Sequence, residues 1–377
     1  MAGIYIHFPF CKQACTYCNF HFSTSFKNHE ILLESMYKEI ELRNNFFENE
    51  VIDSIYFGGG SPSLLTSKSI DKFILKLKSF FNISSSAEIT VELNPDDSST
   101  KYLKDLKEIG VNRLSLGIQS FIEEDLQLMK RAHSSFQAHD SIEKVKSIFK
   151  NFSIDLIYGL PNSNLNNWMY NLNTSLSFDP PHMSCYVLTV EPKTLLKKQI
   201  DSGKVSLIEE SKVEEQYSMM VEYLEEKQYH NYEFSSFAKH GNRSINNTGY
   251  WEGKPYLGIG PSAHSFDGKN KRSWNISQNK LYLKSIKENK LPLTEENLSP
   301  KDKFNEKIMT GLRTSSGVSL NYIKDEFGSR YANYLEENSK NLILSNDLYW
   351  DGDSLHVTKK SKFLSDGIAS DLFIIDL

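Results

Sequence analysis

The stretch that decides how this chain folds is GIYIHFPFCKQACTYCNFH, residues 3–21. Residues 3–8 predict a first β-strand. Cys11, Cys15 and Cys18 follow this strand directly, so one loop supplies three thiols in the spacing C-x3-C-x2-C. Thiolates are soft ligands, and three of them crowded into one loop indicate a metal centre rather than a disulfide framework.

Two kinds of metal centre fit these thiols. With His21 as a fourth ligand, the site would be a tetrahedral Cys3His zinc site. Without a fourth protein ligand, it would be a [4Fe–4S] cluster with one iron open to an exogenous chelator. The chain has four cysteines, and the remaining one, Cys185, lies in an apolar run. We expect Cys185 to be a buried small hydrophobic residue.

The composition narrows the classes of partner and compartment. The 377 residues carry 43 Lys and Arg against 48 Asp and Glu, a net charge of -5. This balance argues against a nucleic-acid-binding face, because neutralising phosphates needs a positive surplus. No apolar run approaches the ~20 residues of a membrane span, and the first residues show no export signal. We therefore expect a cytoplasmic protein that binds no nucleic acid.

Short strand-like runs alternate with longer amphipathic stretches in the first half of the chain. Strands are predicted over 3–8, 51–57, 87–93, 113–118, 153–157 and 183–190, and helices over 30–47, 68–81, 102–109, 120–130, 139–149 and 168–176. Six such steps predict an α/β fold whose parallel strands are joined by right-handed crossovers. Because an eight-fold barrel needs eight steps, we expect a partial (β/α)6 TIM-like barrel, with a doubly wound sheet as the alternative.

The alternation stops after residue 191. We assign residues 1–268 to the core domain with its extension, the Lys-rich residues 269–298 to a linker, and residues 299–377 to a C-terminal domain. In that domain helices are predicted at 304–312, 320–327 and 331–341, followed by a hairpin over 342–357. This order predicts a small C-terminal α/β cap of winged-helix type.

Further motifs lie at the predicted strand ends. They are Gly58-Gly59-Gly60-Ser61-Pro62-Ser63, Glu92-Leu93-Asn94-Pro95, the run from Arg113 to Phe121, Arg131-Ala132-His133, and the run from Asp155 to Pro161. With the cysteine loop, they resemble the radical S-adenosylmethionine (SAM) enzymes. Within these, they resemble the oxygen-independent coproporphyrinogen oxidase-like family and most closely its haem-chaperone branch. The resemblance covers nearly the whole chain and implies that residues 299–377 form the HemN-type C-terminal domain of that family.

The resemblance implies a role for each matching residue. Cys11, Cys15 and Cys18 would hold a [4Fe–4S] cluster, whose open iron is chelated by SAM. The residues expected around the cluster and SAM are Tyr5 and Tyr17 flanking the cluster, Gly59, Gly60 and Ser61 at the methionine end of SAM, and Glu92, Gln119, Arg131 and Asp155 along the rest of it. Arginine and carboxylate side chains suit the charged and hydroxyl groups of such a ligand.

One position of the cysteine loop distinguishes the branches of this family. The oxidases carry a fourth cysteine two residues after the third, where this chain has Phe20. This difference implies a haem chaperone that binds haem, passes it to membrane-associated haem-accepting proteins, needs an electron donor, and lacks coproporphyrinogen III dehydrogenase activity. The alternatives are an oxygen-independent coproporphyrinogen III oxidase, acting by radical oxidative decarboxylation, and a zinc-stapled binding protein. A haem-associated His-Asn-x-x-Tyr-Trp motif of the branch has Asn246 in place of its histidine here, so the axial ligand of the haem iron stays unassigned.

Overall fold

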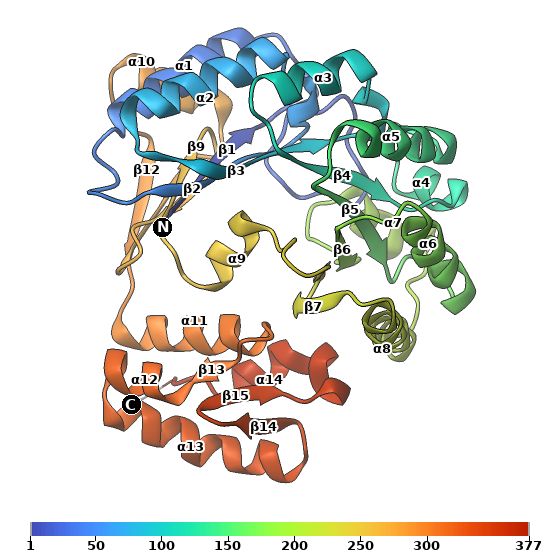
Figure 1. The fold of residues 1–377 in the computed structure, drawn as a ribbon, viewed down its shortest axis with the longest axis vertical. Coiled ribbons are helices and arrows are strands. Elements are labelled where there is room, and N and C mark those ends of the chain that lie inside the picture. The colour runs from blue at the N-terminus through green and yellow to red at the C-terminus, as the bar shows by residue number, and fades with distance from the viewer. Residues whose placement is uncertain (1, 376–377) are drawn as a thin grey trace.

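A computed structural model describes residues 2–375 and shows one curved sheet of twelve strands (Figure 1). Six consecutive strands in its centre run parallel. They are β1 (Ala2–Phe8), β2 (Ile52–Gly59), β3 (Ile83–Leu93), β4 (Arg113–Gln119), β5 (Phe152–Tyr158) and β6 (His182–Val187). Within residues 2–375, β12 and β7 are the two end strands of this sheet. The partial (β/α)6 barrel predicted from the sequence is confirmed by the six parallel strands and their connecting helices.

Helices cover the outer side of this curve (Figure 1). They are α1 (His29–Leu42), α2 (Ser67–Phe80), α3 (Thr100–Glu108), α4 (Glu123–Leu128), α5 (Ser135–Ile148) and α6 (Leu165–Ser177). The sequence sets where several of them begin. Ser134 and Gln137, for example, form a reciprocal capping box that satisfies free backbone N–H groups at the start of α5.

Alternation along each strand separates the core from the inner surface of the curve. In β1, Ile4, Ile6 and Phe8 are at most 1% exposed and belong to the core beneath the helices. Tyr5 and His7 point the other way, because successive side chains of a strand face opposite sides of a sheet. The inner surface therefore collects the polar side chains of the central strands.

The chain after β6 returns to the start of the sheet. After α7 (Leu195–Asp201) and α8 (Glu210–Glu226), β7 (His230–Glu233) and β8 (Ser236–Ala238) extend the sheet beyond β6. Helix α9 (Ile245–Trp251) then packs on the inner side against β1 and β2. Strand β9 (Tyr256–Ile259) pairs in parallel with β1 on the side away from β2.

Residues 269–298, expected to be a linker, carry regular structure that extends the sheet. Beyond β9 lie β10 (His264–Phe266), β11 (Lys271–Asn275) and β12 (Leu293–Asn297), and α10 (Asn279–Lys287) connects the last two. The sequence did not predict these elements, because β11 and β12 are short and polar and so lack the apolar pattern of the central strands. The domain boundaries themselves stay a prediction.

The C-terminal part has its own hydrophobic core. Its elements are α11 (Pro300–Leu312), β13 (Val318–Ser319), α12 (Leu320–Phe327), α13 (Ser329–Leu344), β14 (Leu348–Asp351), β15 (Ser354–Val357) and α14 (Ser365–Asp371). Helices followed by a hairpin match the prediction, except that residues 342–344 end α13 instead of forming a strand. Arg313 connects the two parts, since its guanidinium lies over the rings of Phe234 (4.8 Å) and Trp251 (5.3 Å) of the first part.

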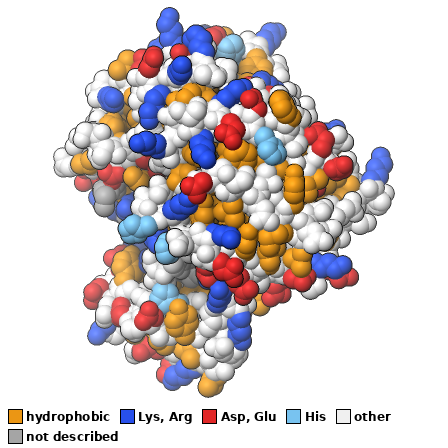
Figure 2. Space-filling view, turned by 45° about the vertical axis from the view of Figure 1, so that its right-hand side comes forward, with side chains coloured by type: hydrophobic (Ala, Val, Ile, Leu, Met, Phe, Trp, Pro, Cys, Tyr) orange, Lys and Arg blue, Asp and Glu red, His pale blue; other side chains and the backbone are white. Residues whose placement is uncertain are grey.

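The surface fits the near balance of charges in the sequence. On the face shown in Figure 2, basic and acidic side chains are interspersed around apolar side chains that gather in the middle. No helix within residues 2–375 combines the length and the apolar character needed to cross a bilayer. Cys185 is 1% exposed, so its predicted burial is confirmed.

Candidate functional site

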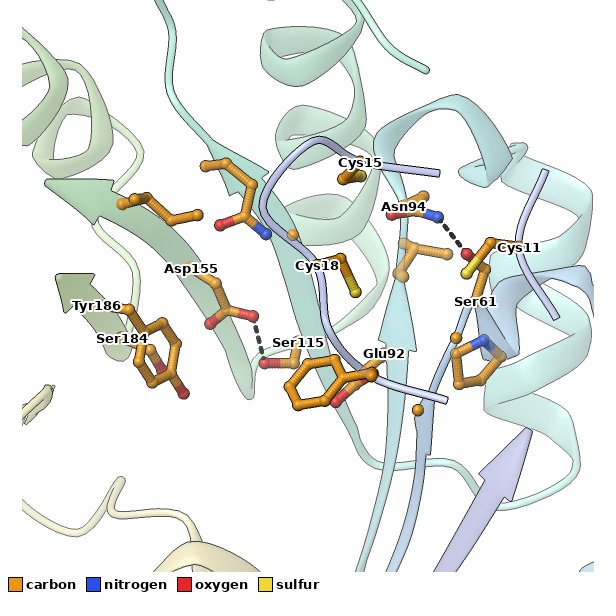
Figure 3. Close-up of a pocket in the computed structure, with 18 of the residues that line it drawn as sticks. Cys11, Cys15, Cys18, Ser61, Glu92, Asn94, Ser115, Asp155, Ser184 and Tyr186 are labelled. Atoms are coloured by element: carbon orange, nitrogen blue, oxygen red, sulfur yellow. Dashed lines mark hydrogen bonds between the residues drawn. The ribbon is translucent and has the colours of Figure 1, made fainter. Parts of the chain in front are cut away.

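A cavity of about 710 Å³ opens on the inner side of the parallel strands. Every residue predicted for the cluster and SAM lines it, although these residues come from seven separate stretches of the chain. They are Tyr5, Cys11, Cys15, Tyr17, Cys18, Gly59, Gly60, Ser61, Glu92, Gln119, Arg131 and Asp155. Figure 3 shows the cysteine loop passing over one side of this cavity, with Asp155, Ser184 and Tyr186 on the other.

The cysteine loop is tied to the fold at two points. At the first cysteine, the Cys11 N–H donates to the Ser23 carbonyl oxygen at 3.1 Å. Between the second and third cysteines, Thr16 donates from its N–H to the Met129 carbonyl oxygen (3.0 Å) and from its hydroxyl to the Leu128 carbonyl oxygen (3.1 Å). These bonds hold the loop against the end of α4, where Arg131 also lies.

The three thiols suit a soft metal centre. All of them are free and partly exposed to the cavity. Burial raises the pKa of the Cys11 thiol to about 11 and also raises the pKa of Cys18, so binding a metal would release protons. Among residues 2–375, no three His, Cys, Asp or Glu side chains already converge on one point. The case for a metal centre therefore rests on the three thiols and on the cavity that they share. The alternative zinc ligand, His21, has its Nε2 within 2.7 Å of Asn279 Oδ1.

The glycine run after β2 allows two pieces of backbone to touch. The Ser61 N–H donates to the Phe10 carbonyl oxygen at 2.7 Å, and the Gly60 N–H donates to the Phe8 carbonyl oxygen at 2.8 Å. A Cβ atom on Gly60 would stand 2.5 Å from the Phe10 carbonyl oxygen, closer than real side chains come. Gly60 therefore lets the residue before Cys11 lie against β2, a role that the sequence did not reveal.

Glu92 lies at the end of β3 in a partly buried position. It accepts a hydrogen bond from the Tyr56 hydroxyl at 3.0 Å. Burial, reinforced by the nearby carboxylate of Asp155, raises the pKa of Glu92 to about 8, although the bond from Tyr56 acts in the opposite direction. Without a ligand, Glu92 is therefore mostly protonated at neutral pH.

Arg131 and Asn94 form a polar group beside Cys15. Arg131 donates from Nη2 to Asn94 Oδ1 (2.8 Å) and to the Gly117 carbonyl oxygen (2.9 Å), and its Nη1 lies 3.4 Å from Cys15 Sγ. Asn94 in turn donates to the Ser61 hydroxyl at 2.9 Å, as Figure 3 shows. The Arg131 Nε is buried and has no hydrogen-bond partner within the described residues.

Asp155 and Gln119 lie on the neighbouring strands β5 and β4. Asp155 accepts hydrogen bonds from the hydroxyls of Ser115 (2.9 Å) and Ser153 (2.8 Å), and burial raises its pKa. Gln119 has a φ of +68° at an irregularity in the β4–β5 pairing. A left-handed backbone is unusual for glutamine and typical of residues near functional sites.

Several lining residues were not predicted. Tyr56, Asn94 and Ser115 lie within or next to recognised motifs, and alternation along their strands would have placed two of them on the inner surface. Asn246 is 7% exposed at the start of α9, with its Oδ1 accepting from the Ser54 hydroxyl at 3.2 Å. Asn246 therefore connects α9 to β2. His133, from the motif that begins with Arg131, is buried and has its Nε2 3.1 Å from the Ile118 carbonyl oxygen.

Comparison with known proteins agrees with this geometry. Residues 5–171 match the Radical SAM superfamily, and residues 298–364 match the HemN C-terminal domain. The chain is 32% identical to a protein of Bacillus subtilis named "Heme chaperone HemW", with 98% of each chain covered. It is 31% identical to a protein of that name from Lactococcus lactis, covering 99% of this chain and 97% of the relative.

A solved structure shows the same fold over the whole chain. It is described as "Coproporphyrinogen III oxidase (HemN) from Escherichia coli is a Radical SAM enzyme" and superposes with a TM-score of 0.85 at 22% identity. The match covers 99% of this chain and 90% of that one. From the two matched domains and the full-length relatives, the chain belongs to the radical SAM superfamily and, within it, to the family of the haem chaperones named HemW.

Proposed function

We propose that this protein is a cytoplasmic haem chaperone that holds one [4Fe–4S] cluster and SAM, binds haem, and delivers it to membrane-associated acceptor proteins. The observation that carries this proposal is the set of three free cysteines on one loop over a cavity, with Phe20 where a fourth thiol would stand. The full-length relatives named haem chaperones support it.

Cys11, Cys15 and Cys18 would hold the cluster, and the other lining residues would hold SAM. The bound cluster can supply one electron, and SAM offers a sulfonium that this electron can cleave. The remaining work falls to the protein. Arg131 would pair with the carboxylate of SAM, Ser61 and the backbone at Gly59 and Gly60 would meet its methionine end, and Glu92 would accept hydrogen bonds from it.

The deeper side of the cavity would position the rest of SAM. Asp155, already fixed by two serine hydroxyls, would accept a hydrogen bond there, and Gln119 would donate one from a strained backbone position. Tyr5 and Tyr17 would flank the cluster and keep water from it. Burial raises the pKa values of both tyrosines, so their hydroxyls stay neutral beside the thiolates.

A second candidate function is oxidative decarboxylation of coproporphyrinogen III. The full-length superposition on a protein described as coproporphyrinogen III oxidase favours it. At 22% identity that likeness concerns the fold, and Phe20 distinguishes this chain from the family pattern of the oxidases. Incubation of the reconstituted protein with coproporphyrinogen, SAM, a reductant for the cluster and an electron acceptor separates the two functions, because formation of protoporphyrinogen would overturn the chaperone proposal.

Reconstitution without oxygen and titration with haemin test the main proposal. The purified chain is expected to take up about four irons, and its cluster spectrum is expected to change when SAM is added. Haemin is expected to give a shifted Soret band that fades when a haem-free acceptor protein is supplied. Zinc without iron, or a Soret band identical to that of free haemin, would contradict the proposal.

A further inference from the structure

The cavity continues past the residues assigned to the cluster and SAM. Its lining includes the first halves of β4 and β6 and the start of α9, through Arg113, Ser115, His182, Ser184 and Asn247. Alternate residues of β4, from Arg113 through Ser115 to Gly117, all reach it. At a rise of about 3.3 Å per residue, Arg113 lies roughly 13 Å along the strand from Gly117, whose carbonyl oxygen binds Arg131.

Arg113 is a buried cation whose ion-pair partner, Glu88, lies beyond hydrogen-bond distance. Its side chain is 3% exposed. Within residues 2–375, its Nε has no hydrogen-bond partner, and Glu88 Oε2 lies 3.9 Å from it, beyond hydrogen-bond distance. A buried guanidinium without hydrogen-bond acceptors costs free energy, so we expect a group that accepts hydrogen bonds from it.

Glu88 is already occupied by α9. One of its oxygens accepts from the Ser244 hydroxyl and the Asn246 N–H, both at 3.2 Å, and the other from the Ile245 N–H at 3.2 Å. Glu88 therefore caps the start of α9, where a carboxylate is favoured by the helix dipole. Its charge lies near Arg113 but leaves the donors of the guanidinium free.

The other buried arginines contrast with Arg113. Arg43, which lies 3.6 Å from Glu39, donates to the Gly258 carbonyl oxygen (3.1 Å) and the Ser273 hydroxyl (3.4 Å). Arg131 has protein acceptors as well. The contrast indicates that the cavity, and not the protein, supplies the acceptor for Arg113.

We propose that Arg113 binds a carboxylate of a second ligand that enters the cavity beside SAM. A guanidinium pairs with a carboxylate through two parallel hydrogen bonds. Because Glu88 and Asp155 lie nearby, a singly charged anion fits better than a phosphate dianion. The carboxylate could belong to a tetrapyrrole propionate, which would deepen the proposed function, or to a small free acid. The inference rests on the proposed function only for the first source.

Affinity for haemin and for haemin dimethyl ester tests the first source. The ester lacks free carboxylates, so the wild-type chain is expected to bind haemin on the order of 10- to 100-fold more tightly. Arg113→Gln is expected to bind both compounds equally, and Arg113→Lys to recover part of the difference. Arg43→Gln is the matched control, because it removes a buried arginine of a Glu–Arg pair outside the cavity and is expected to retain the discrimination. Melting temperatures and SAM binding identify a variant that has failed to fold.

A second arm tests a small free acid. If the ester and haemin bind equally, propionate at millimolar concentration is expected to raise the melting temperature of the wild type and of Arg43→Gln but not of Arg113→Gln. Two results together would overturn the inference. The wild type would bind the ester as tightly as haemin, and propionate would have the same effect on the wild type as on Arg113→Gln. Absence of haemin binding by the wild type would refute the proposed chaperone function alone, and the propionate arm would then decide the inference.

Discussion

Replacing Gly60 by alanine is expected to disturb the cysteine loop from outside it. The new Cβ atom would stand 2.5 Å from the Phe10 carbonyl oxygen and 2.8 Å from the Phe10 nitrogen. Since carbon and oxygen ordinarily stay about 3.3 Å apart or more, the two backbones must separate by on the order of 1 Å. Both contacts are to backbone atoms, which cannot swing aside as a flexible side chain could.

The cost can be estimated from the contacts that this separation breaks. Overpacking of this kind costs about 1–3 kcal/mol, and weakening the 2.7 Å bond from the Ser61 N–H to the Phe10 carbonyl oxygen costs about 1 kcal/mol more. We expect the free energy of unfolding to fall by about 2–4 kcal/mol. Because Phe10 precedes Cys11, we also expect the cluster to be lost to a chelator about tenfold more readily.

The assay is anaerobic reconstitution followed by a timed chelator challenge and a thermal melt. Gly367→Ala is the matched control, because no atom lies within 4 Å of its added Cβ and alanine is favoured within helix α14. The control is expected to match or exceed the wild type in stability. If Gly60→Ala retained its iron and its melting temperature as the control does, the close-approach explanation for the glycine run would be refuted.

Three further predictions concern single residues of the cavity and core. The pKa of Glu92 is raised in the folded chain to about 8, so folding favours its protonated form, and stability is lost as pH rises from about 4.5 to 8. Glu92→Gln removes this loss, and urea melts of the two chains without SAM should diverge by up to roughly 5 kcal/mol by pH 9; parallel curves would be the contrary result. Arg131→Gln loses charged hydrogen bonds to Asn94 and Gly117. Equilibrium dialysis should show that its affinity for SAM falls about 10- to 100-fold. An unchanged affinity would contradict the proposed role of Arg131 in binding SAM. Burial raises the pKa of Cys185 and keeps its thiol from solvent. Alkylation of the native cluster-free chain, followed by mass mapping, should therefore modify the loop cysteines faster as pH rises and leave Cys185 unmodified. Labelling of Cys185 at the same rate would contradict its burial.

The central strands could be predicted because one of their sides packs under the helices and the other faces the cavity. In β1 and β4, residues such as Ile4, Ile6 and Leu116 alternate with inward-facing polar residues, which produces a clear strand pattern. The strands from β7 to β12 are short and pair near the edges of the sheet, and runs of three to five residues show no clear alternation. The return of β9 to the side of β1 joins residues some 250 positions apart, and no local pattern predicts such a contact.

The candidate site was predicted as far as its motifs extend. Glu92 and Gln119 lie at the ends of β3 and β4, and the carboxyl ends of parallel strands meet at one edge. Asp155 lies in the middle of β5 and reaches the same cavity from the inner side of that strand. Tyr56 and Arg113 were not predicted as lining residues, because a polar residue within a strand can equally face solvent. Counting by twos from Gly58 and Ser115 would have placed both on the inner surface.

The pairing of β9 with β1 bears on how the protein is made. The strand that leads into the cysteine loop acquires its second neighbour only when residues 256–259 have left the ribosome, because Gly3 to Ile6 pair with them. During synthesis the cysteines therefore leave the ribosome long before the strand that completes the pairing of β1. Insertion of the proposed cluster into a finished site would have to follow translation of the sheet, and nascent chains stalled before residue 256 should present their cysteines on an incomplete scaffold.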